Sequence, residues 1–93
     1  MYLLIVYDIP CDKRRLAVDK ILSSYGVRVN LSVFEVTLKT RSHGDRLREK
    51  LLEAMKAEDD SIRIYPLDKT TVVKAEELGS RRAPFVQESG YVF

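Results

Sequence analysis

The chain opens with a run that is apolar on both sets of alternating positions, YLLIVYDI at residues 2–9. Such a run is typical of a central strand covered on both faces. Apolar side chains then recur at helical spacing over residues 12–25, and Gly26 stands where a helix would end. Asp12 is the expected N-cap residue. The pattern therefore predicts an interior strand followed by a helix.

The next segment, residues 27–38, changes the parity of its apolar positions near Ser32. Strict alternation cannot change phase without a bulge or a tight turn, so the pattern fits either two short strands or one bent strand. A second amphipathic helix should follow and extend to about residue 57. Ser42 and Asp45 are spaced like a capping arrangement at its start.

The last third of the chain holds one clear strand pattern and a tail. SIRIYPL at 61–67 alternates as a half-buried strand does, whereas residues 70–78 fit either a short strand or a helix. The tail from Ser80 onward has too little periodicity for a core of its own. Its apolar residues need cover, and a second protomer is the natural candidate; they are Phe85, Val86, Tyr91, Val92 and Phe93.

The order strand, helix, strand, strand, helix, strand predicts an α+β protein with a ferredoxin-like βαββαβ fold. Two helices should cover one face of a four-stranded antiparallel sheet. We expect one domain over residues 1–93, with a core at 1–79 and a C-terminal extension strand within 80–93 that packs on a partner. A chain of 93 residues buries only a modest fraction of its surface, so a homodimer is expected.

Composition excludes several classes of protein. No apolar run approaches the ~20 residues of a membrane-spanning helix, and no segment resembles a secretory leader, so we expect a cytoplasmic protein without a membrane partner. Cys11 and His43 are the single cysteine and histidine, which excludes zinc clusters and leaves oxygen ligands for any metal. The net charge of +2 does not by itself indicate nucleic-acid binding.

A carboxylate, Asp8, ends the apolar first strand at the point where the chain leaves the sheet. A side chain at such a place can meet a ligand, or it can cap the helix that follows, and position alone leaves both alternatives open. As a ligand it would suit Mg²⁺ or Mn²⁺, which accept one or two carboxylates together with water and phosphate. A two-fold dimer could supply a second copy of the carboxylate.

Several segments together resemble the CRISPR-associated protein two family, the small partner of the CRISPR integrase. The similarity runs from residue 1 to about residue 79 and rests on VYDI, Arg14-Arg15, GVRVNLSVFE, SIRIYPL and Leu78-Gly79. This resemblance implies a homodimer that joins integrase subunits, binds duplex DNA and inserts it as new spacers. Some members are described as metal-dependent nucleases on RNA or duplex DNA. In that case Asp8 would be the metal-binding and catalytic residue.

The resemblance also extends to single positions. Arg15 and Arg28 match basic positions near the site, and Arg14 and Arg15 oppose the dipole of the first helix, which favours an external anionic partner. These three arginines are the predicted nucleic-acid-binding residues. Asn30 replaces a glutamine found in many members, and Ala17 replaces an arginine of some members reported to cleave RNA.

Tyr7, Ser32 and Phe34 are predicted supporting residues of the site. Each also has an ordinary structural explanation. Phe34 is more often core than a stacking platform, and Tyr7 is more often a packing residue. Ser32 is better explained by strand irregularity than as a nucleophile, since no histidine is near it in sequence.

Three functional hypotheses follow. A scaffold that binds duplex DNA and bridges integrase subunits is the favoured interpretation. A nuclease would hold Mg²⁺ or Mn²⁺ between Asp8 and its symmetry mate and would cleave single-stranded RNA or duplex DNA. Related small folds include toxin ribonucleases and ligand-binding regulatory modules. The last are least favoured, because the chain has no glycine-rich phosphate cradle.

Overall fold

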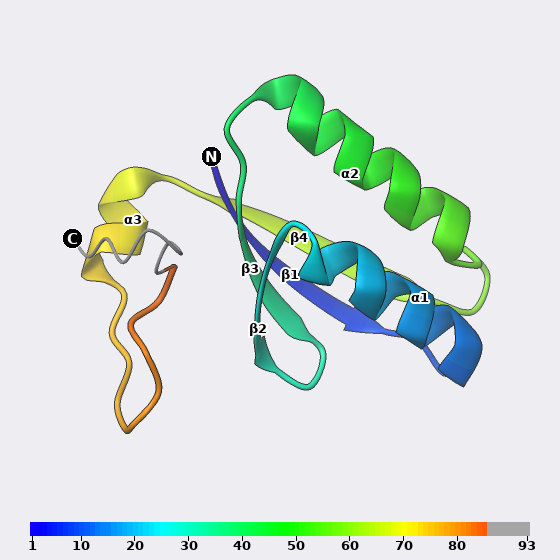
Figure 1. Cartoon of the computed structure of the whole chain (residues 1–93), viewed down its shortest axis with the longest axis horizontal. Coiled ribbons are helices and arrows are strands. Elements are labelled where there is room, and N and C mark those ends of the chain that lie inside the picture. The colour runs from blue at the N-terminus through cyan, green and yellow to red at the C-terminus, as the bar shows by residue number, and fades with distance from the viewer. Residues whose placement is uncertain (86–93) are drawn as a thin grey trace.

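A computed structural model describes residues 1–85, and these form four strands and three helices (Figure 1). In chain order the elements are β1 (Tyr2–Asp8), α1 (Asp12–Ser23), β2 (Gly26–Asn30), β3 (Val33–Thr37), α2 (Arg41–Ala54), β4 (Ser61–Leu67) and α3 (Lys69–Lys74). This order confirms the predicted ferredoxin-like fold. The open alternative at 70–78 is settled in favour of a short helix. None of the helices in this part of the chain is long and apolar enough to cross a membrane.

The sheet has the order β2-β3-β1-β4, with every neighbouring pair antiparallel. β1 is therefore interior, as its apolar run predicts. Both α1 and α2 lie on one face of the sheet (Figure 1). The core forms between them and comprises Leu3, Ile5, Tyr7, Ile9, Val18, Leu22, Phe34, Val36, Leu38, Leu47 and Leu51.

The other face of the sheet, here called the open face, is not covered by α1 or α2 (Figure 1). Alternate residues of β1, among them Leu4 and Val6, point to it and are half-buried. Phe85 covers part of this face: its backbone N–H donates to Glu35 Oε1 at 2.8 Å, and its ring meets Tyr2 edge-on with centroids 5.6 Å apart. Phe85 thus packs within its own chain.

The predicted extension strand is not formed at residues 80–85, which make bends and a turn. The other apolar tail residues, Val86, Tyr91, Val92 and Phe93, lie outside the described residues. Arg81 adds a second tie between this segment and the sheet, because its Nη1 donates to the carbonyl of Val29 at 2.6 Å. The segment therefore lies back against the strands of its own chain.

The change of phase seen in the sequence comes from two features. A turn at Leu31 and Ser32 separates β2 from β3, so two strands are present and not one bent strand. The register also shifts between Arg28 and Asn30, as at a β-bulge. β2 lies very close to β3 where it begins, since a Cβ on Gly26 would be 2.2 Å from a carbonyl oxygen of β3.

Two predicted helix caps are wrong. Cys11 occupies the N-cap of α1 without a side-chain hydrogen bond, and Asp12 is already helical. In α2 the cap is Thr40, whose hydroxyl accepts the N–H of His43 at 3.2 Å, while Ser42 lies inside the helix. The helix begins two residues earlier than an N-cap at Ser42 would require, so the hydroxyl of Thr40 reaches the free N–H instead. α2 also ends at Ala54, short of residue 57.

Candidate nucleic-acid interface

Asp8 is the last residue of β1, opposite Ser61 of β4, and it is exposed. Strand alternation places it on the open face together with Leu4 and Val6. It does not cap the helix that follows, because no side chain caps α1. The carboxylate has no hydrogen-bond or ion-pair partner within residues 1–85. It is therefore free to meet a ligand.

The surroundings of Asp8 limit how a metal could bind. Among the described residues, no three His, Cys, Asp or Glu side chains come together as a possible metal site. A single carboxylate still suits Mg²⁺, which retains waters and takes further oxygen ligands from phosphate groups. The remaining charge would have to come from a second chain or from the nucleic acid. The residues thus fit a metal that is shared, not one held by this chain alone.

Tyr7, the neighbour of Asp8, is buried under α1 with only 3 % of its surface exposed. Its hydroxyl donates a hydrogen bond to Asp19 Oδ1. Burial, and then this bond to a carboxylate, raises the pKa of Tyr7 to about 12. The same carboxylate forms an ion pair with Arg28, Nη2 to Oδ2 at 3.1 Å. Asp19 therefore ties β1 and β2 to α1.

Arg28 has further contacts at the β2–β3 turn. Its guanidinium lies over the ring of Phe34, 5.0 Å from the centroid, and it donates to the carbonyl of Leu31. The hydrogen bond to Asp19 is the main cause that raises the pKa of Arg28. Phe34 is a core residue, 1 % exposed, as its ordinary explanation predicts. Arg28 thus holds the turn, and part of its side chain stays exposed.

Arg14 lies apart from the β2–β3 turn and forms an ion pair with Asp60. Its Nε and Nη2 donate to the two carboxylate oxygens of Asp60 at 2.8 and 3.0 Å, a bidentate pair. The side chain of Asp60 is fully buried and also accepts the N–H of Lys56 at 2.8 Å. The hydrogen bond from Arg14 lowers the pKa of Asp60. This pair fastens α1 to the loop between α2 and β4.

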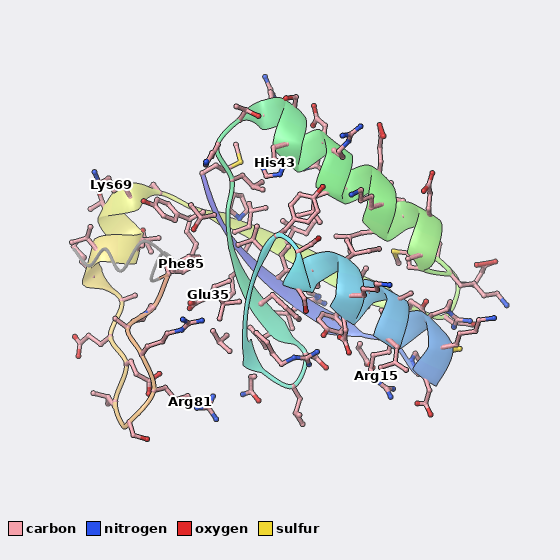
Figure 2. All side chains as sticks on the ribbon, in the orientation of Figure 1. Arg15, Glu35, His43, Lys69, Arg81 and Phe85 are labelled. Atoms are coloured by element: carbon pink, nitrogen blue, oxygen red, sulfur yellow. The ribbon has the colours of Figure 1, made fainter. Side chains whose placement is uncertain are left out.

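Arg15 and Ser32 complete the predicted set. Arg15 pairs with Asp12, one turn earlier on α1, with Nη2 and Oδ1 2.8 Å apart, and its side chain points away from the helix (Figure 2). Ser32 lies in the β2–β3 turn, where its carbonyl accepts the N–H of Tyr7 at 3.1 Å. Ser32 has a backbone role here, which agrees with its structural explanation.

The structure brings some predicted residues together and leaves others apart. Arg28, Tyr7, Phe34 and Ser32 meet around the β2–β3 turn, whereas Arg14 belongs to a separate ion pair. Nucleic-acid contact by the three arginines stays a prediction.

Two residues that organise this region, Asp19 and Asp60, were missed by the sequence analysis. Asp19 stands one turn after Arg15, and Asp60 ends an acidic run that reads as a solvated turn. Neither position carries a local signal of its distant partner.

Together these features define a small ferredoxin-like protein with an exposed carboxylate at the end of its central strand. Its uncovered sheet face is a surface on which another chain could pack. Proteins of this fold have many functions, so the family of this chain has to be identified by comparison with known proteins.

The chain matches the model of the family described as CRISPR associated protein Cas2 over residues 1–75, and it belongs to that family. It is 41% identical over 75 residues to CRISPR-associated endoribonuclease Cas2 3 of Synechocystis sp., covering 81% of this chain and 80% of that protein. It is 39% identical over 93 residues to CRISPR-associated endoribonuclease Cas2 1 of Chloroflexus aurantiacus, covering 99% of both.

A solved structure gives the same result. The fold matches a chain of a partial Cas6-RT-Cas1–Cas2 complex with a TM-score of 0.72 and 32% identity, covering 92% of this chain and 97% of that chain. The predicted resemblance to the family is thereby confirmed.

Proposed function

We propose that this protein is the dimeric DNA-binding subunit that works with the integrase Cas1 in acquiring new CRISPR spacers. The observation that carries this proposal is the open face of the sheet, which ends in the exposed carboxylate of Asp8. A fold match to a chain of a complex that contains Cas1 and Cas2 supports the partner. The protein would act in the cytoplasm, where duplex DNA and the integrase are available.

The open face supports the homodimer. It carries apolar residues at Leu4, Val6 and Val33, and Tyr65 on the edge strand is 44 % exposed. Specific interfaces bury about 800 Å² on each partner, which a sheet face of this kind can supply. A two-fold axis through this face would bring the two copies of Asp8 to the same interface.

A second candidate function, nucleic-acid cleavage, is favoured by the exposed Asp8 and by the endoribonuclease names of the two relatives. Two Asp8 carboxylates could hold Mg²⁺ or Mn²⁺, which when bound would polarise a phosphate oxygen and activate water. Arg15 and the exposed part of Arg28 would hold the backbone of single-stranded RNA or duplex DNA. One carboxylate per chain is a small ligand set, so scaffolding comes first.

The experiment compares wild type, Asp8→Ala and Glu49→Ala for binding and cleavage of labelled duplex DNA and single-stranded RNA, with Mg²⁺, Mn²⁺ or chelator. Glu49 is the matched control, because its carboxylate is also exposed and, like that of Asp8, has no hydrogen-bond or ion-pair partner within residues 1–85. We expect all three proteins to have twice the 10.7 kDa mass of one chain in solution and to bind duplex DNA in a salt-sensitive way.

Cleavage by wild type and Glu49→Ala, but not by Asp8→Ala, would add the nuclease function and assign it to Asp8. Equal cleavage by all three would contradict a catalytic Asp8. A monomer that binds no duplex DNA, alone or with the integrase, would contradict the proposed function itself.

A further inference from the structure

Two opposite charges stand on either side of β1 on the open face. In the sheet register Leu4 lies between Glu35 of β3 and Tyr65 of β4, and Val6 is opposite Arg63. Residues directly opposite each other in a sheet share a face, so all five side chains belong to the open face. Among the positions that alternate in this way, β3 carries one acid, Glu35, and β4 carries one base, Arg63.

Glu35 is half-buried, and it forms no ion pair within residues 1–85. Its Oε1 accepts the N–H of Phe85 at 2.8 Å, and the two residues lie together on this side of the sheet (Figure 2). Burial is the main cause that raises the pKa of Glu35, while Arg82 is near enough to lower it without forming an ion pair. A cation at the second carboxylate oxygen would therefore stabilise the charged form.

Arg63 and Tyr65 form a hydrogen-bonded pair on β4. Arg63 Nη1 donates to the Tyr65 hydroxyl at 3.3 Å, and this bond is the main cause that raises the pKa of Arg63. Both residues are exposed, and within the described chain Arg63 has no carboxylate partner. The guanidinium keeps further N–H groups, and the hydroxyl keeps its own proton to donate. The Arg63–Tyr65 pair thus presents adjacent donors that suit a carboxylate.

Symmetry decides what this pair would meet in a dimer. A two-fold axis that runs across the strands would place the two Asp8 residues at opposite ends of the interface. An axis along β1 places them at the same end, as the proposed function requires. Two sheets packed in this way lie about 10 Å apart, with their strands within about 30° of each other. The same axis lays β3 of one copy over β4 of the other.

We propose that Glu35 of each copy binds the Arg63–Tyr65 pair of the second copy across the open face. The inference rests on the proposed function and names the polar contact that orients its dimer. Because of the two-fold axis the contact forms twice, once on each side of Leu4 and Val6. Apolar side chains alone would allow the sheets to slide or turn, whereas two opposite-charge contacts select one register.

The remaining acid at the open-face positions of the strands, Asp8, does not compete for Arg63 in this arrangement. Asp8 ends the central strand, so an axis along β1 brings it to its own symmetry mate. Arg63 lies on β4 and is carried over β3 of the other copy, where Glu35 is the nearby carboxylate. The contact thus holds the two Asp8 residues at one end of the interface without using them.

The test exchanges the two charges between separate full-length chains. At a concentration where wild type has twice the 10.7 kDa mass of one chain, Glu35→Arg alone and Arg63→Glu alone should be monomeric, because each places like charges at both contacts. In an equimolar mixture, both contacts between a Glu35→Arg chain and an Arg63→Glu chain join opposite charges again. We expect native mass spectrometry of the mixture to show a dimer with one chain of each kind.

The matched controls are Glu49→Arg and Arg46→Glu, which reverse exposed charges on α2, on the other side of the sheet. Each control should be dimeric alone. Dimers of wild-type strength from both open-face variants alone would overturn the pairing and leave the homodimer. Two folded monomers that do not combine on mixing would overturn it as well. A monomeric wild type would overturn the proposed dimer, and with it the proposed function.

Neutral substitutions keep the inference testable if a reversed charge prevents folding, which circular dichroism would show. Glu35→Gln retains an acceptor for the N–H of Phe85 and loses only the charge. Glu35→Gln and Arg63→Gln should each weaken dimer association by about 30-fold or more. The double substitution should weaken it by less than the product of the two single effects, because both remove the same contact. Independent effects that multiply would overturn the pairing.

Discussion

Replacing Tyr7 with phenylalanine isolates the hydrogen bond that ties β1 to Asp19. The ring should stay in place, since it is 3 % exposed and packs near Phe34 with centroids 6.2 Å apart. Only the hydroxyl is lost, together with its bond to a carboxylate. Hydrogen bonds to charged groups contribute about 1.5–3 kcal/mol, and Asp19 keeps Arg28 as a partner, so we expect a loss near the lower limit.

Thermal unfolding followed by circular dichroism measures this loss. A loss of each kcal/mol should lower the Tm of a domain of this size by about 4–8 °C. The control is Tyr25→Phe, because the Tyr25 hydroxyl makes no hydrogen bond within the described residues, and its Tm should stay unchanged. Equal Tm values for Tyr7→Phe and wild type would refute the structural role of the Tyr7 hydroxyl.

The pH dependence gives a second check on the same group. Because the pKa of Tyr7 is raised from 10.0 to about 12 on folding, the folded state favours its neutral form. The stabilisation is fully present below pH 10 and is lost as the pH rises towards 12. The stability difference between wild type and Tyr7→Phe should therefore shrink between pH 10 and pH 12. A constant difference across that window would contradict the assigned cause.

Two further substitutions test the packing around the site. Gly26→Ala should lower the free energy of unfolding by about 1–3 kcal/mol, because the new Cβ would lie 2.2 Å from the Glu35 carbonyl oxygen. Gly44→Ala is the control, since its Cβ would meet only the end of a leucine side chain at 3.0 Å. Equal losses of stability for the two variants in chemical denaturation would contradict this explanation. Asp60→Asn should destabilise the protein at neutral pH by removing the charge that Arg14 pairs with. The pKa of Asp60 is lowered from 3.8 in the folded protein, so the ion pair stabilises the protein less as the pH falls below that value. The urea midpoints of wild type and Asp60→Asn should therefore converge in acid, and a difference that persists there would argue against the ion pair.

The sequence predicted the architecture well, because apolar periodicity reports directly on which side chains face a core. The alternation in SIRIYPL gave β4 with its bounds, and the apolar run gave β1 its interior place. Boundaries were less predictable. Two nearby hydroxyls, Thr40 and Ser42, could each cap α2, and only the exact start of the helix decides between them.

The site was predicted residue by residue but not as a set of contacts. Arg14 and Arg28 were expected to face nucleic acid, yet each meets a carboxylate that is distant or on another element. Asp60 is 46 residues from Arg14, and no local pattern reports a pair at that separation. Asp8, in contrast, was placed correctly at an exposed strand end, since that follows from the strand pattern alone.

The central place of β1 also decides when the molecule can fold. Of the described elements, β1 leaves the ribosome first, but its neighbours are β3 and β4, and β4 ends only at Leu67. Pairing of segments so far apart in sequence is slow, because a long loop must close before any contact forms. Until then the apolar strand has no partner on one edge. A stalled chain that ends before β4 would therefore expose β1, the segment most prone to aggregate. The first strand to be synthesised is thus the last to acquire both of its neighbours.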